Sequence, residues 1–569
     1  MNLTYTLSFP EPQTHYIEVK LTVSNHNKKA IDLKMPVWTP GSYLIREFSR
    51  HIEQFESKNS KVIKKAKNYW TAVPESDKEV VITYKIYAYE MSVRTSFVDM
   101  DLALLNGASI FLRCDNKDAN SYKVALKPFK EWKKINTSLS ESGNQWERVA
   151  ENFDELIDSP ILLGNQSQYS FDVNGVPHSL AMAGEAEYDS AKVVADMQKV
   201  CVKAAEIIGE HPCKQYTFLV INANSGSGGL EHANSCVLHT SRNVYTNDGQ
   251  YKNFLGLVAH EYFHLWNVKR IRPVELGPFD YDNENYTSML WFSEGFTSYY
   301  DDLICVKAGI ISPERYMEIT SSNINTIENV PGNKVQSVSE ASFDAWIKYY
   351  RANENSQNAT SNYYTKGSII GLLLDLQIIS NSKGKKSLDD LMKILYTKYY
   401  KGLNRGFTES EFKIEAENLS GVKLDSFFSK YINGTESIDY NSVIKRLGLQ
   451  LVNLNQDKTE VSLGANINQA GGRNIVSSVV RNSAAWKYGV NFNDEILAVD
   501  SSKINGDLQQ ILNTKRVGDT IQLMVNRDGI IKLIKVKLEP FSLYAYRLQK
   551  KPEITEEEQL LFDKWLLNR

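Results

Sequence analysis

Two histidines four residues apart, with a glutamate directly after the first, are the residues of this sequence best suited to bind a metal ion. They lie in the stretch VAHEYFHLWNVKRIRP, from Val258 to Pro273. On an α-helix, residues four apart share one face, so His260 and His264 can present two imidazole nitrogens to one point, with Glu261 beside it. This set is typical of zinc-assisted hydrolysis, in which the glutamate acts as general base. The alternative is a buried helix whose histidines form hydrogen bonds within the core.

A third metal ligand is expected downstream, because catalytic zinc usually takes three protein ligands and leaves one position for water. In the apolar and aromatic stretch MLWFSEGFTSYYDDL (Met289–Leu303), Glu294 is the only acid before Asp301. A lone carboxylate in such a stretch is costly to bury unless a metal neutralises its charge. We therefore expect His260, His264 and Glu294 to hold one Zn²⁺ per chain and to lower the pKa of a bound water toward about 7. The alternative is a surface acid on an amphipathic helix.

The segments that must position these residues predict a multidomain α+β protein. Over residues 1–172 apolar side chains recur with period two, which predicts an N-terminal β-sandwich-like domain. Long helical patterns dominate residues 173–440 and predict a mainly helical catalytic domain. Short strands return over residues 445–545, where Asp528-Gly529 is a hairpin turn signal, and predict a small third domain. Within residues 553–569, the stretch Thr555–Leu567 starts with a capping box and has apolar helical spacing, which predicts a final helix that docks on the rest.

Composition excludes several classes of partner. The chain has 569 residues, which favours three or four domains, and its formal net charge of -3 offers no electrostatic footprint for nucleic acid or an anionic membrane. Five scattered cysteines without a C-x-x-C pair argue against a disulfide framework and against a thiolate zinc site. No apolar run approaches the roughly 20 residues that a membrane span requires. We expect a cytoplasmic protein, or a periplasmic or secreted one if a signal peptide preceded this numbering.

The zinc helix with its tail, H-E-Y-F-H-L-W-N-V-K-R-I-R-P, resembles the signature of the glycyl aminopeptidase family of zinc metallopeptidases. W-F-S-E-G-F-T-S-Y-Y looks like the third-ligand helix of that family, and Trp38–Ile52 is similar to a segment of its N-terminal β domain. Arg481–Asp500 resembles a PDZ domain, which the family carries at its C-terminal end. The resemblance covers nearly the whole chain and implies a thermolysin-like catalytic domain followed by a PDZ-like domain.

Two further motifs resemble functional stretches of zinc aminopeptidases. G-G-L-E-H is similar to the Gly-x-x-Glu-Asn stretch of larger relatives, whose glutamate binds the free α-amine of the substrate. The resemblance implies a substrate-binding role for Gly228, Gly229, Glu231 and His232, with His232 at the place of the asparagine. Y-Y-T-K-G-S is similar to Tyr-x-Lys-Gly-Ala, whose tyrosine stabilises the oxyanion, and the Lys-Gly register implies this role for Tyr364.

The function implied by the resemblance is hydrolysis of an N-terminal residue, Gly or Ala, from peptides with a free N-terminus. Glu261 would take a proton from water and deliver it to the leaving amine. Two alternatives stay open: a zinc endopeptidase in which Glu231 is incidental, and a protein whose PDZ-like domain binds peptides by β-augmentation while the peptidase domain serves as scaffold. The tail after His264 carries the cations Lys269, Arg270 and Arg272, for which we have only a structural explanation. Cations are favoured at the C-terminus of a helix, and Pro273 would stop that helix.

Overall fold

The computed structural model describes residues 1–26, 29–75, 79–114, 121–458, 461–504, 506, 508–540 and 543–567. The chain divides into two compact units, and each unit combines stretches that are distant in sequence. The first unit consists of Met1–Thr287, Tyr300–Ile311 and Asp389–Glu415. The second unit consists of Ser288–Tyr299, Ser312–Leu388 and Ala416–Arg569.

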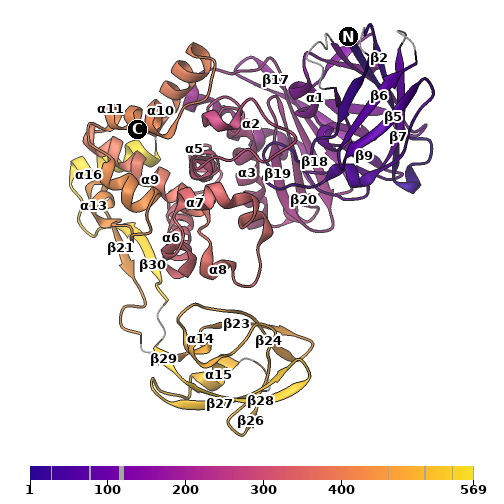
Figure 1. Cartoon of the computed structure of the whole chain (residues 1–569). Coiled ribbons are helices and arrows are strands. Elements are labelled where there is room, and N and C mark those ends of the chain that lie inside the picture. The colour runs from indigo at the N-terminus through magenta and orange to yellow at the C-terminus, as the bar shows by residue number, and fades with distance from the viewer. Residues whose placement is uncertain are drawn as a thin grey trace. The chain divides into compact units, whose positions relative to one another are not determined.

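The first unit begins with a sheet-rich region, drawn in indigo in Figure 1. Its seven-stranded sheet has the order β13-β14-β11-β1-β2-β7-β4. Alternate residues of these strands are buried, as the period-two pattern predicts; β2, for example, buries every second residue of its length. The strands span Asn2–Ser8 (β1), Tyr16–Ser24 (β2), Ile52–Ser57 (β4), Val80–Tyr87 (β7), Ser121–Lys127 (β11), Ser140–Ser142 (β13) and Asn144–Ala150 (β14).

Two four-stranded sheets complete this region, with the orders β10-β3-β6-β5 and β12-β15-β9-β8. Their strands span Ile31–Lys34 (β3), Ser60–Ala66 (β5), Tyr69–Pro74 (β6), Phe97–Val98 (β8), Leu102–Leu105 (β9), Arg113–Cys114 (β10), Lys134–Thr137 (β12) and Ile161–Gly164 (β15). The short helix α1 (Phe153–Ile157) lies between β14 and β15, and Asp158 is its C-cap. The N-terminal region is therefore rich in sheets, as the sequence predicts.

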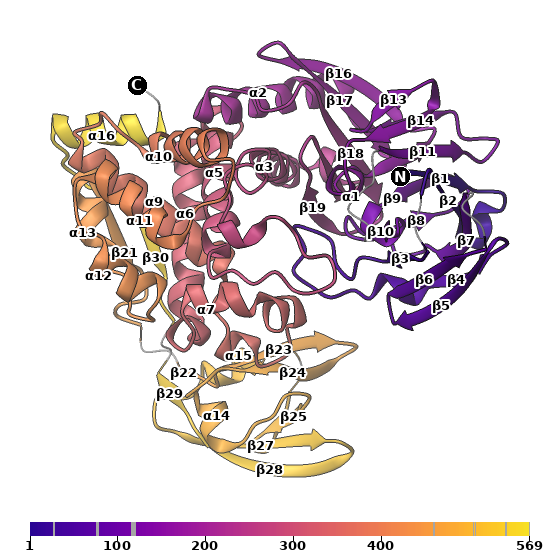
Figure 2. The ribbon, with the colours of Figure 1, turned by 45° about the horizontal axis from the view of Figure 1, so that its top comes forward.

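A five-stranded sheet of order β16-β17-β18-β20-β19 follows in the first unit. Its strands span Ser167–Val173 (β16), Val176–Ala183 (β17), Tyr216–Ala223 (β18), Ser227–Glu231 (β19) and Ser235–Ser241 (β20). The strands β17, β18 and β20 are parallel, whereas β19 runs antiparallel to β20 at the end of the order. Helix α3 (Asp248–Phe263) contains His260 and has His264 as its C-cap. It packs against β19, β20 and helix α2 (Ser190–Ile208), and Figure 2 shows it beside α2 and β19.

The helical part of the second unit packs around α9 (Tyr363–Asn381). This helix is buried on nearly all sides, which an apolar sequence without a polar stripe predicts. Its neighbours are α4 (Leu290–Ser293), α6 (Pro313–Asn329), α7 (Val338–Phe343), α13 (Asn441–Ile444) and α16 (Glu556–Leu566). The capping box predicted for the last helix is present, with Thr555 as N-cap and Glu558 at the third helical position.

The C-terminal sheet has the order β23-β24-β25-β27-β28. Its strands span Ala465–Ala470 (β23), Arg473–Val479 (β24), Glu495–Val499 (β25), Thr520–Arg527 (β27) and Ile530–Lys537 (β28). The predicted hairpin is confirmed, because Asp528 and Gly529 join β27 to β28 with φ of 52° and 80°. Before and after this region, β21 (Leu449–Asn453) pairs with β30 (Tyr546–Lys550). No helix among the described residues is long and apolar enough to cross a membrane.

Candidate active site

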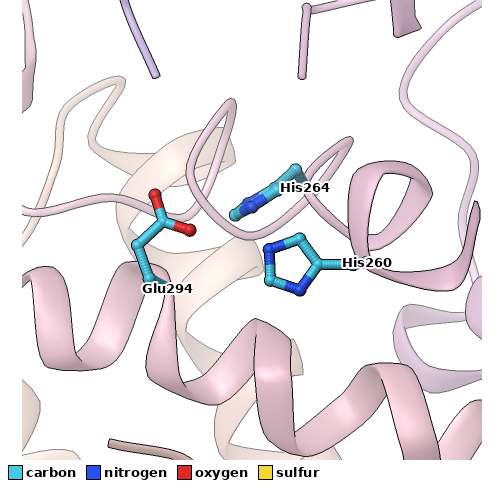
Figure 3. Close-up of side chains that lie close together, drawn as sticks. All are labelled: His260, His264 and Glu294. Atoms are coloured by element: carbon cyan, nitrogen blue, oxygen red, sulfur yellow. The ribbon is translucent and has the colours of Figure 1, made fainter. Parts of the chain in front are cut away.

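The structure brings the three expected metal ligands together. One ligand atom from each of His260, His264 and Glu294 lies within 4.8 Å of the others, and Figure 3 shows the carboxylate turned toward the two imidazole rings. Glu294 is only 2% exposed and lies between α4 and α5 (Gly295–Lys307). It is therefore a buried residue and not a surface acid of an amphipathic helix.

Hydrogen bonds at the far side of each ring determine which nitrogen faces a metal. His260 donates from Nδ1 to Asp301 Oδ2 at 2.9 Å, and His264 donates from Nδ1 to the Asn267 carbonyl at 2.6 Å. Because both partners are acceptors, a neutral ring carries its proton on Nδ1 and offers the Nε2 lone pair to a metal. Two such imidazoles and a carboxylate form a donor set that suits zinc. Sequence reasoning missed Asp301, although it lies two helical turns after Glu294 and so on the same side.

The expected general base lies beside a second carboxylate. Ligand atoms of Glu231, Glu261 and His264 also lie within 4.8 Å of one another, and both glutamates are buried, at 4% and 5% exposure. Gly229 packs directly on the base, because a Cβ there would lie 2.1 Å from Glu261 Oε1. A Cβ at Gly228 would meet nothing within 4 Å. These glycines belong to β19, the last strand of its sheet, so one backbone edge faces away from β20 and can pair with a peptide main chain.

Glu231 also contacts the N-terminal region. Gly41, in the segment Trp38–Ile52, has φ of 84°, a left-handed conformation that favours glycine. A Cβ at this position would lie 2.5 Å and 2.6 Å from the two carboxylate oxygens of Glu231. The Gly41 backbone therefore lies against the carboxylate, and any larger residue would collide with it.

Tyr364 lies in the first turn of α9, where the Asn362 side chain accepts a hydrogen bond from its backbone N–H at 2.9 Å. Its ring stacks on Tyr349, with 5.4 Å between the centroids. Burial raises the pKa of the Tyr364 phenol well above its usual value, and the negative charge of Glu294 raises it further. The phenol thus keeps its proton and remains a hydrogen-bond donor near the Glu294 carboxylate.

Two glycines allow the Glu294 and Tyr364 segments to come close together. A Cβ at Gly367 would lie 2.3 Å from the Trp291 carbonyl oxygen and 2.8 Å from Gly295 Cα. A Cβ at Gly295 would lie 2.4 Å from Gly367 Cα. The Lys-Gly register after Tyr364 therefore has a packing reason, since α9 crosses the segment after α4 with no room for a side chain.

The tail after the histidine helix does not have the expected form. Helix α3 ends at Phe263, ten residues before Pro273, so the prediction that the cations lie at the C-terminus of a helix that Pro273 stops is wrong. The chain instead turns back, with φ of 124° at Val268, and this turn presents the Asn267 carbonyl to His264. The cations of the tail bind elsewhere; Lys269 donates to Asp158 Oδ1 at 2.8 Å. Asp158 also accepts from Nδ1 of the buried His232 at 2.9 Å.

Comparisons with known proteins agree with this geometry. The model of the M61 glycyl aminopeptidase family matches residues 253–370, that of the Peptidase M61 N-terminal domain matches residues 4–165, and that of the PDZ domain matches residues 446–538. No curated protein sequence matches the chain.

Two solved structures resemble this chain, one over nearly its whole length and the other over about three quarters of it. An aminopeptidase N family protein from Idiomarina loihiensis is 29% identical over 99% of this chain and 100% of its own, with a TM-score of 0.92. An M1 zinc metallopeptidase from Deinococcus radiodurans is 11% identical over 77% of this chain and 94% of its own; its TM-score of 0.50 shows likeness of fold alone. With its N-terminal sheet-rich domain, its M1-like helical region and its PDZ domain, the chain belongs to the M61 glycyl aminopeptidase family of metallopeptidases.

Proposed function

We propose that this chain is a zinc aminopeptidase that removes one N-terminal residue, Gly or Ala, from peptides with a free N-terminus. The observation that carries the proposal is the buried Glu231 carboxylate, whose ligand atom lies within 4.8 Å of those of Glu261 and His264. A carboxylate at this distance can bind the ammonium group of a peptide whose first peptide bond lies beside the base. The preference for Gly or Ala rests on the family alone.

The metal would be held by His260, His264 and Glu294 as one Zn²⁺ per chain, since both Nδ1 atoms are already bound. When bound, zinc supplies Lewis acidity, which polarises the scissile carbonyl and lowers the pKa of water. His264 and Glu294 are buried and His260 is partly buried, and the hydrogen bonds at both Nδ1 atoms hold the rings in place, so the two histidines are preorganised for the metal.

Three side chains of the chain perform the remaining tasks. Glu261 accepts a proton from the attacking water and delivers it to the leaving amine, as a general base that becomes a general acid. The Tyr364 phenol, which stays protonated, donates a hydrogen bond to the oxygen on which negative charge develops. Glu231 holds the α-ammonium group, while the backbone edge at Gly228 and Gly229 aligns the peptide.

The proposal is tested with one peptide in two forms, with a free and with an acetylated N-terminus. We expect release of the first residue from the free form only, and equal cleavage of both forms would instead support an endopeptidase. The Glu261→Gln variant should bind zinc in a 1:1 ratio and lose most of the activity. Metal analysis of that variant separates loss of the base from loss of the metal.

A second function is favoured for the PDZ domain, namely binding of a peptide strand. β23 stands at one end of its sheet order, so among the described strands it pairs only with β24. An edge strand of this kind can accept a peptide by β-augmentation. Titration of the full chain with peptides that carry a free C-terminal carboxylate tests this function by calorimetry, and absence of heat would favour a purely structural domain.

A further inference from the structure

The turn that follows Glu231 is held by a residue far away in the sequence. Residues 232–234 join β19 to β20, and the His232 backbone N–H donates to the Ser235 carbonyl at 2.9 Å. Asp158 accepts from His232 Nδ1 at 2.9 Å through one oxygen and from the Ala233 backbone N–H at 2.8 Å through the other. The two residues directly after Glu231 are thus bound to a single carboxylate of the N-terminal domain.

Two cations of the tail after His264 complete this arrangement. Lys269 donates to Asp158 Oδ1 at 2.8 Å. The Arg270 guanidinium donates to the carbonyls of Ala233 and Leu265 and, at 3.0 Å, to Asn234 Oδ1. The tail is therefore bonded to the turn after Glu231 and, through Leu265, to the residue next to the metal ligand.

The charges in this cluster are largely shielded from solvent and compensate one another. The side chain of Lys269 is 6% exposed, that of Asp158 is 17% exposed and that of His232 is 2% exposed. Burial alone would raise the pKa of Asp158, but the charge of Lys269 and the hydrogen bond from His232 hold it well below its usual range. Asp158 is therefore a carboxylate at neutral pH, and loss of its charge would remove the anion that pairs with Lys269.

We infer that Asp158, together with Lys269 and Arg270, sets the position of the Glu231 carboxylate relative to the metal ligands. With Glu231 held in this position, the site binds peptides whose free α-amine belongs to the residue just before the scissile bond. Asp158 is a positioning residue, because it acts on the site through its hydrogen bonds to His232, Ala233 and Lys269. The Gly41 backbone lies against both oxygens and so limits movement of the Glu231 carboxylate on that side. The inference rests on the proposed function, in which Glu231 binds the ammonium group.

The test compares two inhibitors that differ only in the amine: alanine hydroxamate and propionohydroxamate. Both bind the zinc-loaded enzyme through the hydroxamate, so the ratio of their dissociation constants, measured by calorimetry, reports recognition of the ammonium group. Asp158→Asn should reduce this ratio by about tenfold, the size expected for a charge-assisted hydrogen bond that loses its geometry. The affinity for propionohydroxamate and the zinc content should stay as in the wild type.

Asp154→Asn is the matched control. Asp154 lines the same cavity of about 280 Å³ as Asp158, but its hydrogen bond comes from the Tyr281 hydroxyl and not from the turn after Glu231. Since Asp158→Asn removes a buried charge, Lys269→Met is a second variant that cuts the link to the tail while Asp158 keeps its bonds to His232 and Ala233. It should lower the ratio as well, whereas Asp154→Asn should not.

Three outcomes overturn the inference: wild-type ratios in both Asp158→Asn and Lys269→Met, an equal loss of affinity for both inhibitors, or the same change in Asp154→Asn. Glu231→Gln separates this inference from the proposed function. If Glu231→Gln leaves the ratio of dissociation constants unchanged, Glu231 does not bind the amine and the proposed function fails. If Glu231→Gln removes the preference for alanine hydroxamate while the Asp158 and Lys269 variants keep it, only the positioning role of Asp158 is refuted.

Discussion

Replacement of Gly367 by alanine should disrupt the metal site without touching a ligand. The added Cβ would lie 2.3 Å from the Trp291 carbonyl oxygen and 2.8 Å from Gly295 Cα, both of which are backbone atoms that cannot rotate away. Ordinary contact begins near 3.4 Å, so the two segments must separate by roughly 1 Å. Overpacking of this kind costs about 1–3 kcal/mol, against a helix-propensity gain of about 1 kcal/mol for alanine over glycine.

The separation should displace Glu294 and Tyr364, because Glu294 directly precedes Gly295 and Tyr364 lies one turn before Gly367. We expect zinc affinity to fall by about 10-fold to 100-fold, as for other losses of ligand orientation, together with kcat/KM. Competition with a chromophoric chelator measures zinc affinity, and thermal unfolding of the metal-free protein measures the packing cost separately.

Gly371→Ala is the matched control for this experiment. Gly371 lies one turn further along α9, and the atoms nearest to its Cβ would be side-chain atoms of Phe296, at 3.2 Å, and Tyr299, at 3.4 Å. Because side chains can shift by a few tenths of an ångström, this variant should unfold and bind zinc nearly as the wild type does. Wild-type zinc affinity and unfolding temperature in Gly367→Ala would refute the close-crossing argument.

Three further changes test other parts of the site. Asp301→Asn should weaken zinc binding by about tenfold, because a neutral amide oxygen accepts the hydrogen bond from His260 more weakly than the carboxylate does and the amide can also turn its NH2 group toward the ring; an unchanged affinity in the chelator assay would remove Asp301 from the site. Gly41→Ala should raise KM for alanine amide while zinc content stays constant, since the new methyl group displaces the Glu231 carboxylate; an unchanged KM would contradict this contact. Lys366→Met should stabilise the fold, because burial lowers the pKa of this 2% exposed lysine from 10.5 to about 8. A lowered pKa means that the folded state disfavours the charged form of Lys366, which reduces the free energy of unfolding by roughly 3 kcal/mol. This cost is complete below pH 8, where the lysine is charged in both states, and vanishes by pH 10.5. Urea unfolding should therefore show a gain at pH 7 that is lost near pH 10.5, and a gain independent of pH would point to packing instead.

The features that could be predicted from the sequence are those with a local signature. The spacing of His260 and His264 places two rings on one helix face, and Glu294 is conspicuous because its neighbours are apolar. Capping boxes and the Asp528-Gly529 hairpin depend on a few adjacent residues, so the last helix and the β27-β28 pair are confirmed. The multidomain organisation is confirmed as well, while the domain limits, the catalytic roles and the localisation stay predictions.

The features that could not be predicted depend on contacts between distant residues. Lys269 meets Asp158 across 111 positions, and Gly41 faces Glu231 from another domain of the sequence. Neither contact follows from a period or a motif, because charge and glycine are also common in solvent-exposed turns. The tail was wrongly predicted for a related reason: helix α3 ends at Phe263, and the turn after it brings the Asn267 carbonyl to His264, a contact that no local pattern of residues indicates.

The pairing of β21 with β30 makes the PDZ domain an insertion and not an appendage. The chain leaves the helical part through β21, forms the C-terminal sheet and returns through β30, whose Tyr546 is bound by Asn325 of α6. It then ends in α16, whose Trp565 donates to the Tyr299 hydroxyl in the same helical core. A stop codon placed before the PDZ domain would thus delete part of that core as well. Excision with a short linker from Asn453 to Tyr546, which face each other in the ribbon, would remove the module and leave α16 in place.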